Sequence, residues 1–153
     1  MKFTPKGLKR LLNIYPPYLG AGVKITHISD DWKQMGVRMK LRWYNRNAVG
    51  SHFGGSLYSM VDPQIMLMLM QILGPEYFVW DKSATIDYLQ PATSEVTAEI
   101  LIEDDMLALI KEETHNGEKY LPTFEVLIKD KEQNIIARVD KVLYIRKKPK
   151  HRN

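Results

Sequence analysis

The chain has 153 residues, of which 44% are hydrophobic and 26% charged, as is usual for a single globular domain. It contains no cysteine, which excludes a disulfide framework, a thiolate zinc site and a cysteine nucleophile. Six of its 22 Lys and Arg residues lie in residues 141–153, so residues 1–140 hold 16 basic against 18 acidic residues and do not predict a nucleic-acid-binding surface.

We expect one domain over residues 1–153, because no repeat, linker or change of composition divides it. Residues 1–20 would form an N-terminal helix and lead-in, and residues 147–153 a basic tail. The tail is interpreted as a solvated terminus, with the alternative that it contacts the phosphates of a ligand or a membrane surface.

Two segments bear on location. Residues 1–10 carry several lysines without a long apolar run, so they do not predict a secretory signal. The apolar run at 57–73 contains Asp62 and Pro63 and is too short for a membrane span. We therefore expect a cytoplasmic protein with no integral membrane association.

The first elements are a short helix and two strands. Thr4 and Pro5 are typical of a helix start, and an apolar stripe follows at helical spacing before Pro16 ends it: Leu8, Leu11, Leu12 and Tyr15. A strand is predicted at 23–29. Strict alternation at 35–43, with Trp43 on the apolar face, predicts a half-buried strand.

A glycine-rich polar loop then leads into one long apolar helix, which Gly74 and Pro75 end. The segments after it are predicted as strands at 78–89, 96–102, 106–114, 119–129 and 135–145. Asn116-Gly117 predicts a hairpin turn, and an apolar phase shift near Asp140 predicts a bulge. An antiparallel sheet of this size must curl round a helix that is apolar on all sides, which gives an α+β fold.

The candidate chemistry begins where the loop meets the helix. The first N–H groups of a helix lack intrahelical partners, and Gly54 and Gly55 would let a carbonyl oxygen approach them. The alternative is that both glycines only allow close packing.

Asp62 is the only charged residue between Phe53 and Glu76. Burial disfavours its charged form, and a partly desolvated carboxylate can act as a general base or nucleophile. Alternatively, Asp62 caps a helix that begins at Pro63, or Pro63 kinks one continuous helix.

Other polar residues are weaker candidates. Asn47 could hold a water or a carbonyl, or only shape a turn. His52 could assist proton transfer, or be a surface loop histidine. The four histidines lack metal-ligand spacing, so no metal is expected. A polar face is predicted on the strand at 78–89, made of Asp81, Ser83, Thr85 and Asp87; it would line a site or an interface, or simply face water.

The string N-A-V-G-S-H-F-G-G-S-L-Y-S-M-V-D, residues 47–62, resembles the signature of hotdog-fold acyl-CoA thioesterases of the phenylacetate-pathway type. The strings G-G-S-L-Y, V-W-D-K and L-Y-I-R-K-K are similar to those of a poorly characterised hotdog subfamily of tetrameric acyl-CoA thioesterases. The resemblance covers nearly the whole chain and implies a hotdog fold, in which a curved antiparallel sheet wraps a long central helix.

The resemblance implies a site as well as a fold. Asp62 would activate water or attack the thioester, Gly54 with Gly55 would bind the carbonyl oxygen, and Asn47 would position water or substrate. Substrate-binding or assisting roles would fall to His52, Phe53, Asp81 and Ser83. The site would form between two subunits of a homodimer or homotetramer.

The sequence departs from the family pattern at three points: Phe53 replaces the histidine before the glycines, Pro63 follows the acid, and Asp81 adds a second carboxylate. No cofactor is expected beyond coenzyme A as part of an acyl-CoA or other thioester substrate. There are two alternatives. One is a non-catalytic acyl-CoA or fatty-acyl binding protein, and the other is a hotdog dehydratase or hydratase that uses His52.

Overall fold

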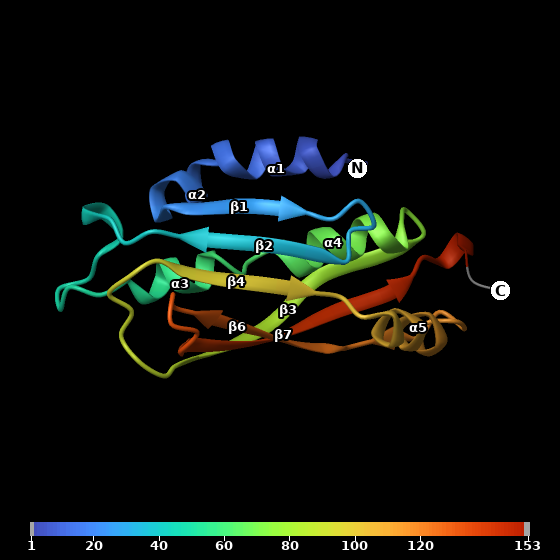
Figure 1. Ribbon diagram of the computed structural model, residues 1–153. Helices are drawn as coiled ribbons and strands as arrows, with labels where there is room; N and C mark the ends of the chain where they lie inside the picture. Colours follow the sequence, from blue (N-terminus) through green and yellow to red (C-terminus); the bar gives the residue numbers. More distant parts are fainter. Residues whose placement is uncertain (1, 152–153) are drawn as a thin grey trace.

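The computed structural model describes residues 2–151, which form a mixed α+β fold with one curved antiparallel sheet (Figure 1). The strand order is β1-β2-β4-β6-β7-β3, and β5 pairs with β7. The strands are β1 (Val23–Ile28), β2 (Gln34–Met39), β3 (Tyr77–Tyr88), β4 (Val96–Leu101), β5 (Lys119–Tyr120), β6 (Thr123–Lys129) and β7 (Ile135–Lys147). The α-helices are α1 (Pro5–Ile14), α2 (Pro16–Ala21), α3 (Gly54–Ser59), α4 (Gln64–Leu73) and α5 (Asp104–Glu113).

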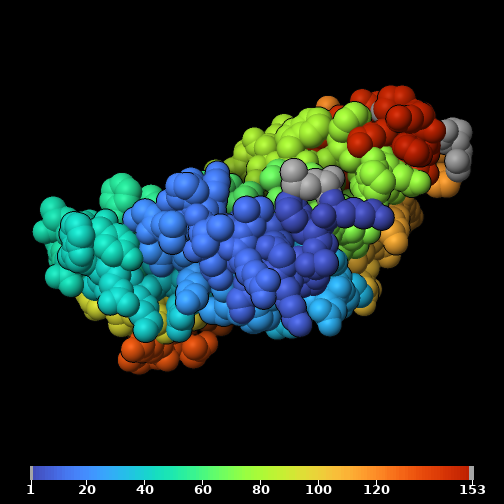
Figure 2. Space-filling view, turned by 90° about the horizontal axis from the view of Figure 1, so that it is seen from above, coloured from blue at the N-terminus to red at the C-terminus, as the bar shows by residue number. Residues whose placement is uncertain are grey.

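The N-terminal helix forms as the sequence predicts. The Thr4 hydroxyl accepts a hydrogen bond from the Gly7 amide at 3.1 Å, and Pro5 occupies the first turn. Leu8 and Leu12 are buried, and α1 lies against β1 at one end of the sheet. Pro16 ends α1 and at once begins α2, because proline is well suited to a first helical turn. Figure 2 shows these helices across the middle of the upper face.

The central apolar segment is two helices instead of one. α3 ends at Ser59 and α4 begins at Gln64, and the intervening turn contains a cis peptide bond between Asp62 and Pro63. Both helices lie against one face of the sheet (Figure 1), and α4 buries Ile65, Met68, Leu69 and Leu73 in the core. The hotdog architecture is therefore present, with its central helix interrupted beside Asp62.

One predicted strand is wrong. All but the last of residues 106–114 belong to α5, which runs from Asp104 to Glu113 and buries Leu107 and Ile110. The spacing of these two apolar residues is helical. Asn116-Gly117 therefore follows a helix instead of joining two strands, and Gly117 takes a positive φ of 80° there.

The strand after the central helices contains a bulge that was not predicted. On β3, Asp81 pairs with Leu143 and Ser83 pairs with Val142, so Lys82 is an extra residue. Asp81 therefore lies on the inner face with buried Leu143, whereas Ser83 is turned to the outer face. The predicted polar face is therefore wrong for Asp81, whereas Ser83, Thr85 and Asp87 do share the outer face.

In β7, every second residue from 137 to 145 faces the core, with no change of phase at residue 140. Val139, Leu143 and Ile145 are buried on the inner face, and Lys141 is buried with them. The bulge on β7 lies at Ile136, not near Asp140. The apparent phase shift in the sequence is thus a lysine in the core. Trp43 also differs from its prediction, because β2 ends at Met39 and the Trp43 side chain is 85% exposed.

Two surfaces of the described chain remain open. β3 is an edge strand, and residues 82–85 on it are exposed in succession, so both of its faces are uncovered there. On α4, Met66, Leu67, Met70 and Ile72 are only partly buried. Within residues 2–151 no helix is long and apolar enough to cross a membrane.

Candidate functional site

A pocket with a volume of 430 Å³ lies where the start of α3 meets the segment after β3. Its lining includes Asn47, His52, Gly54, Leu57, Tyr88 and Pro91. The loop before α3 and the segment after β3 meet at this end of the sheet (Figure 1). Three of the residues picked out from the sequence, Asn47, His52 and Gly54, therefore share one pocket.

Gly54 supports both of the interpretations left open by the sequence. The Tyr88 hydroxyl donates to the Gly54 carbonyl at 3.1 Å, and a Cβ atom on Gly54 would lie 3.0 Å from the tyrosine ring. A side chain at this position would therefore press against the Tyr88 ring, which is 54% exposed and would have to shift slightly. Gly54 and Gly55 also open α3, so their N–H groups have no acceptor within the helix and are suited to an anionic oxygen.

Asn47 is occupied by its own loop. Its side-chain nitrogen donates to Ser51 Oγ at 2.9 Å and to the His52 carbonyl at 3.2 Å, and its oxygen accepts from the amides of Val49 and Ser51. Both N–H bonds of the amide are thus satisfied locally. The arrangement fixes the loop that forms the pocket wall.

His52 is buried, with 3% of its surface exposed, so the interpretation as a surface loop histidine is wrong. Burial lowers the pKa of the ring, and the hydrogen bond to Ser94 offsets part of this. Nε2 lies 2.8 Å from the Ser94 carbonyl, which can only accept, so Nε2 carries the proton. Nδ1 of the neutral ring is then a buried acceptor without a partner among the described residues.

Asp62 lies outside this pocket and belongs to a second cluster. Its side chain is 45% exposed, and the Lys141 ammonium lies 3.1 Å from Oδ1. Asp62 does not cap α4, because the N-cap position is Pro63 and no side chain bonds to the helix amides there. Within one chain, the acid and the Gly54 pocket are separate features.

Lys141 is the functional residue that the sequence interpretation missed. Its side chain is fully buried and lies 3.1 Å from Asp81 Oδ1 as well as from Asp62. The Asp81 contact is an ion pair without hydrogen-bond geometry, since that oxygen has no hydrogen-bond partner among the described residues. The lysine sits between the two carboxylates and offsets the repulsion between them.

The protein surrounds this cluster with further polar contacts. The Tyr18 hydroxyl donates to the Asp62 carbonyl at 2.6 Å and accepts from the Gln64 amide. Burial, with the Asp62 charge second, raises the pKa of Tyr18 far above its ordinary value, so the hydroxyl stays a donor. The Lys141 ammonium lies over the ring of Tyr58, 5.9 Å from the ring centroid. Burial raises the pKa of Tyr58, and the charge of Lys141 offsets part of that rise.

The remaining candidates are not brought into either cluster. Phe53 is 57% exposed, and Ser83 lies on the outer face of β3. Within residues 2–151 no group of three His, Asp or Glu side chains could hold a metal ion.

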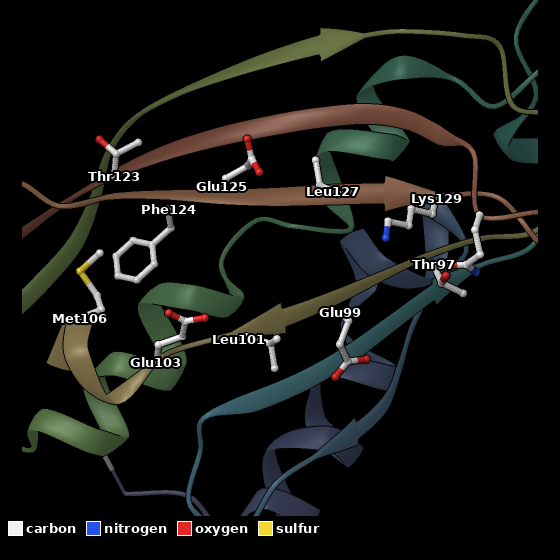
Figure 3. Close-up of a pocket in the computed structure, with 11 residues that line it drawn as sticks. Thr97, Glu99, Leu101, Glu103, Met106, Thr123, Phe124, Glu125, Leu127 and Lys129 are labelled. Carbon is white, nitrogen blue, oxygen red and sulfur yellow. The ribbon is translucent and has the colours of Figure 1, made fainter.

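Another cavity, of 590 Å³, opens between β4 and β6 (Figure 3). The two strands pair at only two positions before they diverge, so the sheet parts there. The polar residues that line the cavity include Glu99, Glu103 and Glu125, and Met106 and Phe124 are apolar lining residues beside them. None of the candidate residues lines this cavity.

The curved sheet around α3 and α4 defines a hotdog-fold protein. The chain belongs to the family described as Domain of unknown function (DUF4442), whose model matches residues 6–145. No curated protein matches the chain in sequence.

Solved structures of other proteins share this fold, among them the three that follow. PA5026 from Pseudomonas aeruginosa, a protein of unknown function described as a probable thioesterase, has a TM-score of 0.79 at 16% identity, over 94% of this chain and 97% of its own. OLEI01261 from Chlorobaculum tepidum, of unknown function, has a TM-score of 0.74 at 17% identity, over 95% and 98%. The thioesterase HI1161 from Haemophilus influenzae has a TM-score of 0.69 at 15% identity, over 100% and 97%.

Proposed function

We propose that this protein hydrolyses an acyl thioester in a site that two copies of the chain complete together. Asp62 is the proposed general base, and the amides of Gly54 and Gly55 the proposed donors to the carbonyl oxygen. The observation that carries the proposal is the state of the Asp62 carboxylate. The carboxylate is about half exposed to solvent, and the ammonium of the buried Lys141 holds it in place. The thioesterase names of PA5026 and HI1161 agree with this chemistry.

The open edge of β3 supports the participation of a second copy. An edge strand of 12 residues with an exposed run at 82–85 is suited to pairing with the same strand of another chain. Because Asp62 and the Gly54 pocket are separate within one chain, a two-fold pairing offers a way for the acid of one copy to face the pocket of the other. The partly exposed apolar face of α4 would gain cover from the same pairing.

The chemistry follows from general base catalysis. Asp62 takes a proton from water as the oxygen attacks the thioester carbonyl carbon. The carbonyl oxygen becomes negative and is held by the α3 amides. Collapse of the intermediate breaks the carbon–sulfur bond, and the proton held by Asp62 passes to the departing thiolate. The products are a carboxylic acid and a free thiol.

The other residues have supporting roles in this proposal. Lys141 holds the Asp62 carboxylate in place, and Asp81 balances the lysine charge. Asn47 shapes the loop instead of holding water, because its amide is already bonded there. His52 forms part of the pocket wall, with its Nδ1 buried.

Thiol release from acyl-CoA substrates tests the proposal. Asp62→Asn is expected to lower the rate by at least about a hundredfold, the range found for a lost general base. Asp105→Asn is the matched control, since Asp105 is an exposed residue of α5. Full activity in Asp62→Asn, or tight acyl-CoA binding by wild type with no thiol released, would defeat the hydrolase.

A further inference from the structure

Six basic residues gather on the outer face of the sheet at the end that holds the Gly54 pocket. They line two hollows, of 240 and 530 Å³, which share Arg38 and Lys40. We call them the basic cluster: Lys24, Arg38, Lys40, Arg42, Arg46 and Lys131. Glu95 is the one acidic residue among those that line the two hollows.

The strand geometry brings these charges together. Arg38, Lys40 and Arg42 alternate along β2 and its extension, so their side chains leave the same side of the chain. Lys24 on β1 is paired directly with Arg38. Like charges in a directly opposed pair disfavour the sheet, so the folded chain holds this arrangement at some cost in stability.

No member of the basic cluster forms an ion pair with a carboxylate in residues 2–151. Elsewhere the protein does pair its cations, as with Lys33 and Asp104 at 2.6 Å or Arg138 and Asp87 at 3.1 Å. An array of unpaired cations around a hollow concentrates positive potential and attracts multiply charged anions. Arg and Lys are also the side chains that phosphates prefer.

The basic cluster adjoins the candidate pocket through one shared wall. Arg46 is joined to His52 by a β-bridge, and the His52 amide donates to the Ala92 carbonyl at 2.9 Å. The larger hollow is lined by Arg46 and Ser94, and the pocket by Asn47 and Ala92. The pocket and the basic cluster are therefore neighbours, with this wall between them.

Two exposed aromatic rings stand beside the same charges. Tyr44 lines the smaller hollow and is 46% exposed. Trp43 is 85% exposed and meets Tyr44 edge to face, with 5.5 Å between ring centroids. Such rings offer a stacking surface for a planar base next to cations that hold phosphate.

We propose that the basic cluster binds the phosphorylated nucleotide end of coenzyme A, so that the substrate is an acyl-CoA and not a carrier-protein thioester. This inference rests on the proposed function, because it identifies the group that carries the thioester hydrolysed beside the Gly54 pocket. Arg38 and Lys40, shared by both hollows, contact the phosphates. Trp43, the more exposed of the two rings, stacks on the adenine, and Tyr44 supports Trp43 edge to face.

Binding of adenosine 3′,5′-bisphosphate to the full chain tests the inference without any turnover. Arg38→Gln/Lys40→Gln is expected to weaken binding at least about tenfold, since each charge-assisted contact contributes about 1.5–3 kcal/mol. Lys111→Gln/Lys119→Gln, which removes the same charge from exposed sites, is expected to leave the affinity unchanged. Trp43→Ala is expected to weaken it about tenfold through lost stacking. Added salt should weaken wild-type binding.

The inference is overturned if wild type shows no saturable binding at millimolar nucleotide. It is equally overturned if both double variants bind alike, if inorganic phosphate competes as well as the nucleotide, or if only an acyl-carrier-protein thioester is hydrolysed with dependence on Arg38 and Lys40. Asp62→Asn separates the two proposals, because it should bind the nucleotide normally. Nucleotide binding without thiol release would remove the hydrolase alone, and acyl-CoA hydrolysis insensitive to Arg38 and Lys40 would remove the nucleotide site alone.

Discussion

Two charged regions of this protein hold their charge in opposite ways. Around Lys141, one fully buried cation is balanced by Asp62 and Asp81, each 3.1 Å from its ammonium. In the basic cluster, six cations lie together without an ion pair to any carboxylate in residues 2–151.

The comparison distinguishes a charged side chain that holds other residues in place from charged side chains that are available to a ligand. A buried ion is costly unless it is paired, so Lys141 fixes the carboxylates and is itself held by them. Exposed cations are well solvated and remain available to a ligand. The neutral His52 lines the pocket, and its backbone is joined by a β-bridge to Arg46 of the basic cluster.

Removal of Lys141 should have the largest effect. Lys141→Met is expected to destabilise the fold by about 3 kcal/mol, because two carboxylates near the core lose their counter-ion. Urea unfolding measures this, and the exposed Lys111→Met should change stability by less than about 0.5 kcal/mol. Adding Asp81→Asn to Lys141→Met should restore part of the loss. Unchanged stability of Lys141→Met would remove the distinction between the two regions.

Loss of one α3 amide beside the pocket should have the next largest effect, in this case on the rate of thiol release. Gly54→Pro removes one N–H while proline suits the first helical turn and the extended Phe53 before it, at ψ 130°. Thiol release should fall about a hundredfold or more, as for a lost oxyanion donor. Gly54→Ala adds the same Cβ contact with Tyr88 but keeps the N–H, so it should retain most of the activity. Equal losses in both variants would assign Gly54 to packing alone.

His52 predicts a smaller, pH-dependent effect. Its pKa is lowered from 6.5 by burial, so the unfolded state binds its proton more readily than the folded state. The stability that the neutral ring contributes is complete above the unfolded pKa and is lost as pH falls toward the lower folded value. Urea midpoints should therefore fall less with acid in His52→Gln than in wild type, while the exposed His115→Gln should behave as wild type. Identical pH profiles for all three would contradict this.

The basic cluster should give the smallest change, and of the opposite sign. Arg38→Gln relieves its repulsion with Lys24 and should raise stability by up to about 0.5 kcal/mol. Thermal unfolding in low salt measures it, and added salt should shrink the difference. Destabilisation of the size seen for Lys141→Met would show that Arg38 is structural.

Local signals in the sequence predict much of the fold. Thr4 and Pro5 start α1, and strict alternation marks β4. The strand predicted at 106–114 is wrong because Asn116-Gly117 was interpreted as a hairpin turn between two strands. Asp104 and Asp105, whose charges favour a helix N-terminus, were not used.

The site is harder to predict because its contacts are remote in sequence. Lys141 follows the inward phase of Val139 and Leu143, so its burial could have been inferred from β7 alone. Its partner Asp81 could not, because the bulge at Lys82 decides which face that acid takes. The basic cluster joins Lys131 to residues of β1 and β2, which only the folded sheet brings together.

Mixed dimers test the central claim, that Asp62 of one copy serves the Gly54 pocket of another. Asp62→Asn and Gly54→Pro, each inactive alone, are unfolded together, refolded and assayed for thiol release from acyl-CoA. Random pairing puts half of the chains into mixed dimers, each with one intact site, so about a quarter of wild-type activity should return. No recovery, despite mixed dimers detected by mass, would contradict a site shared between copies.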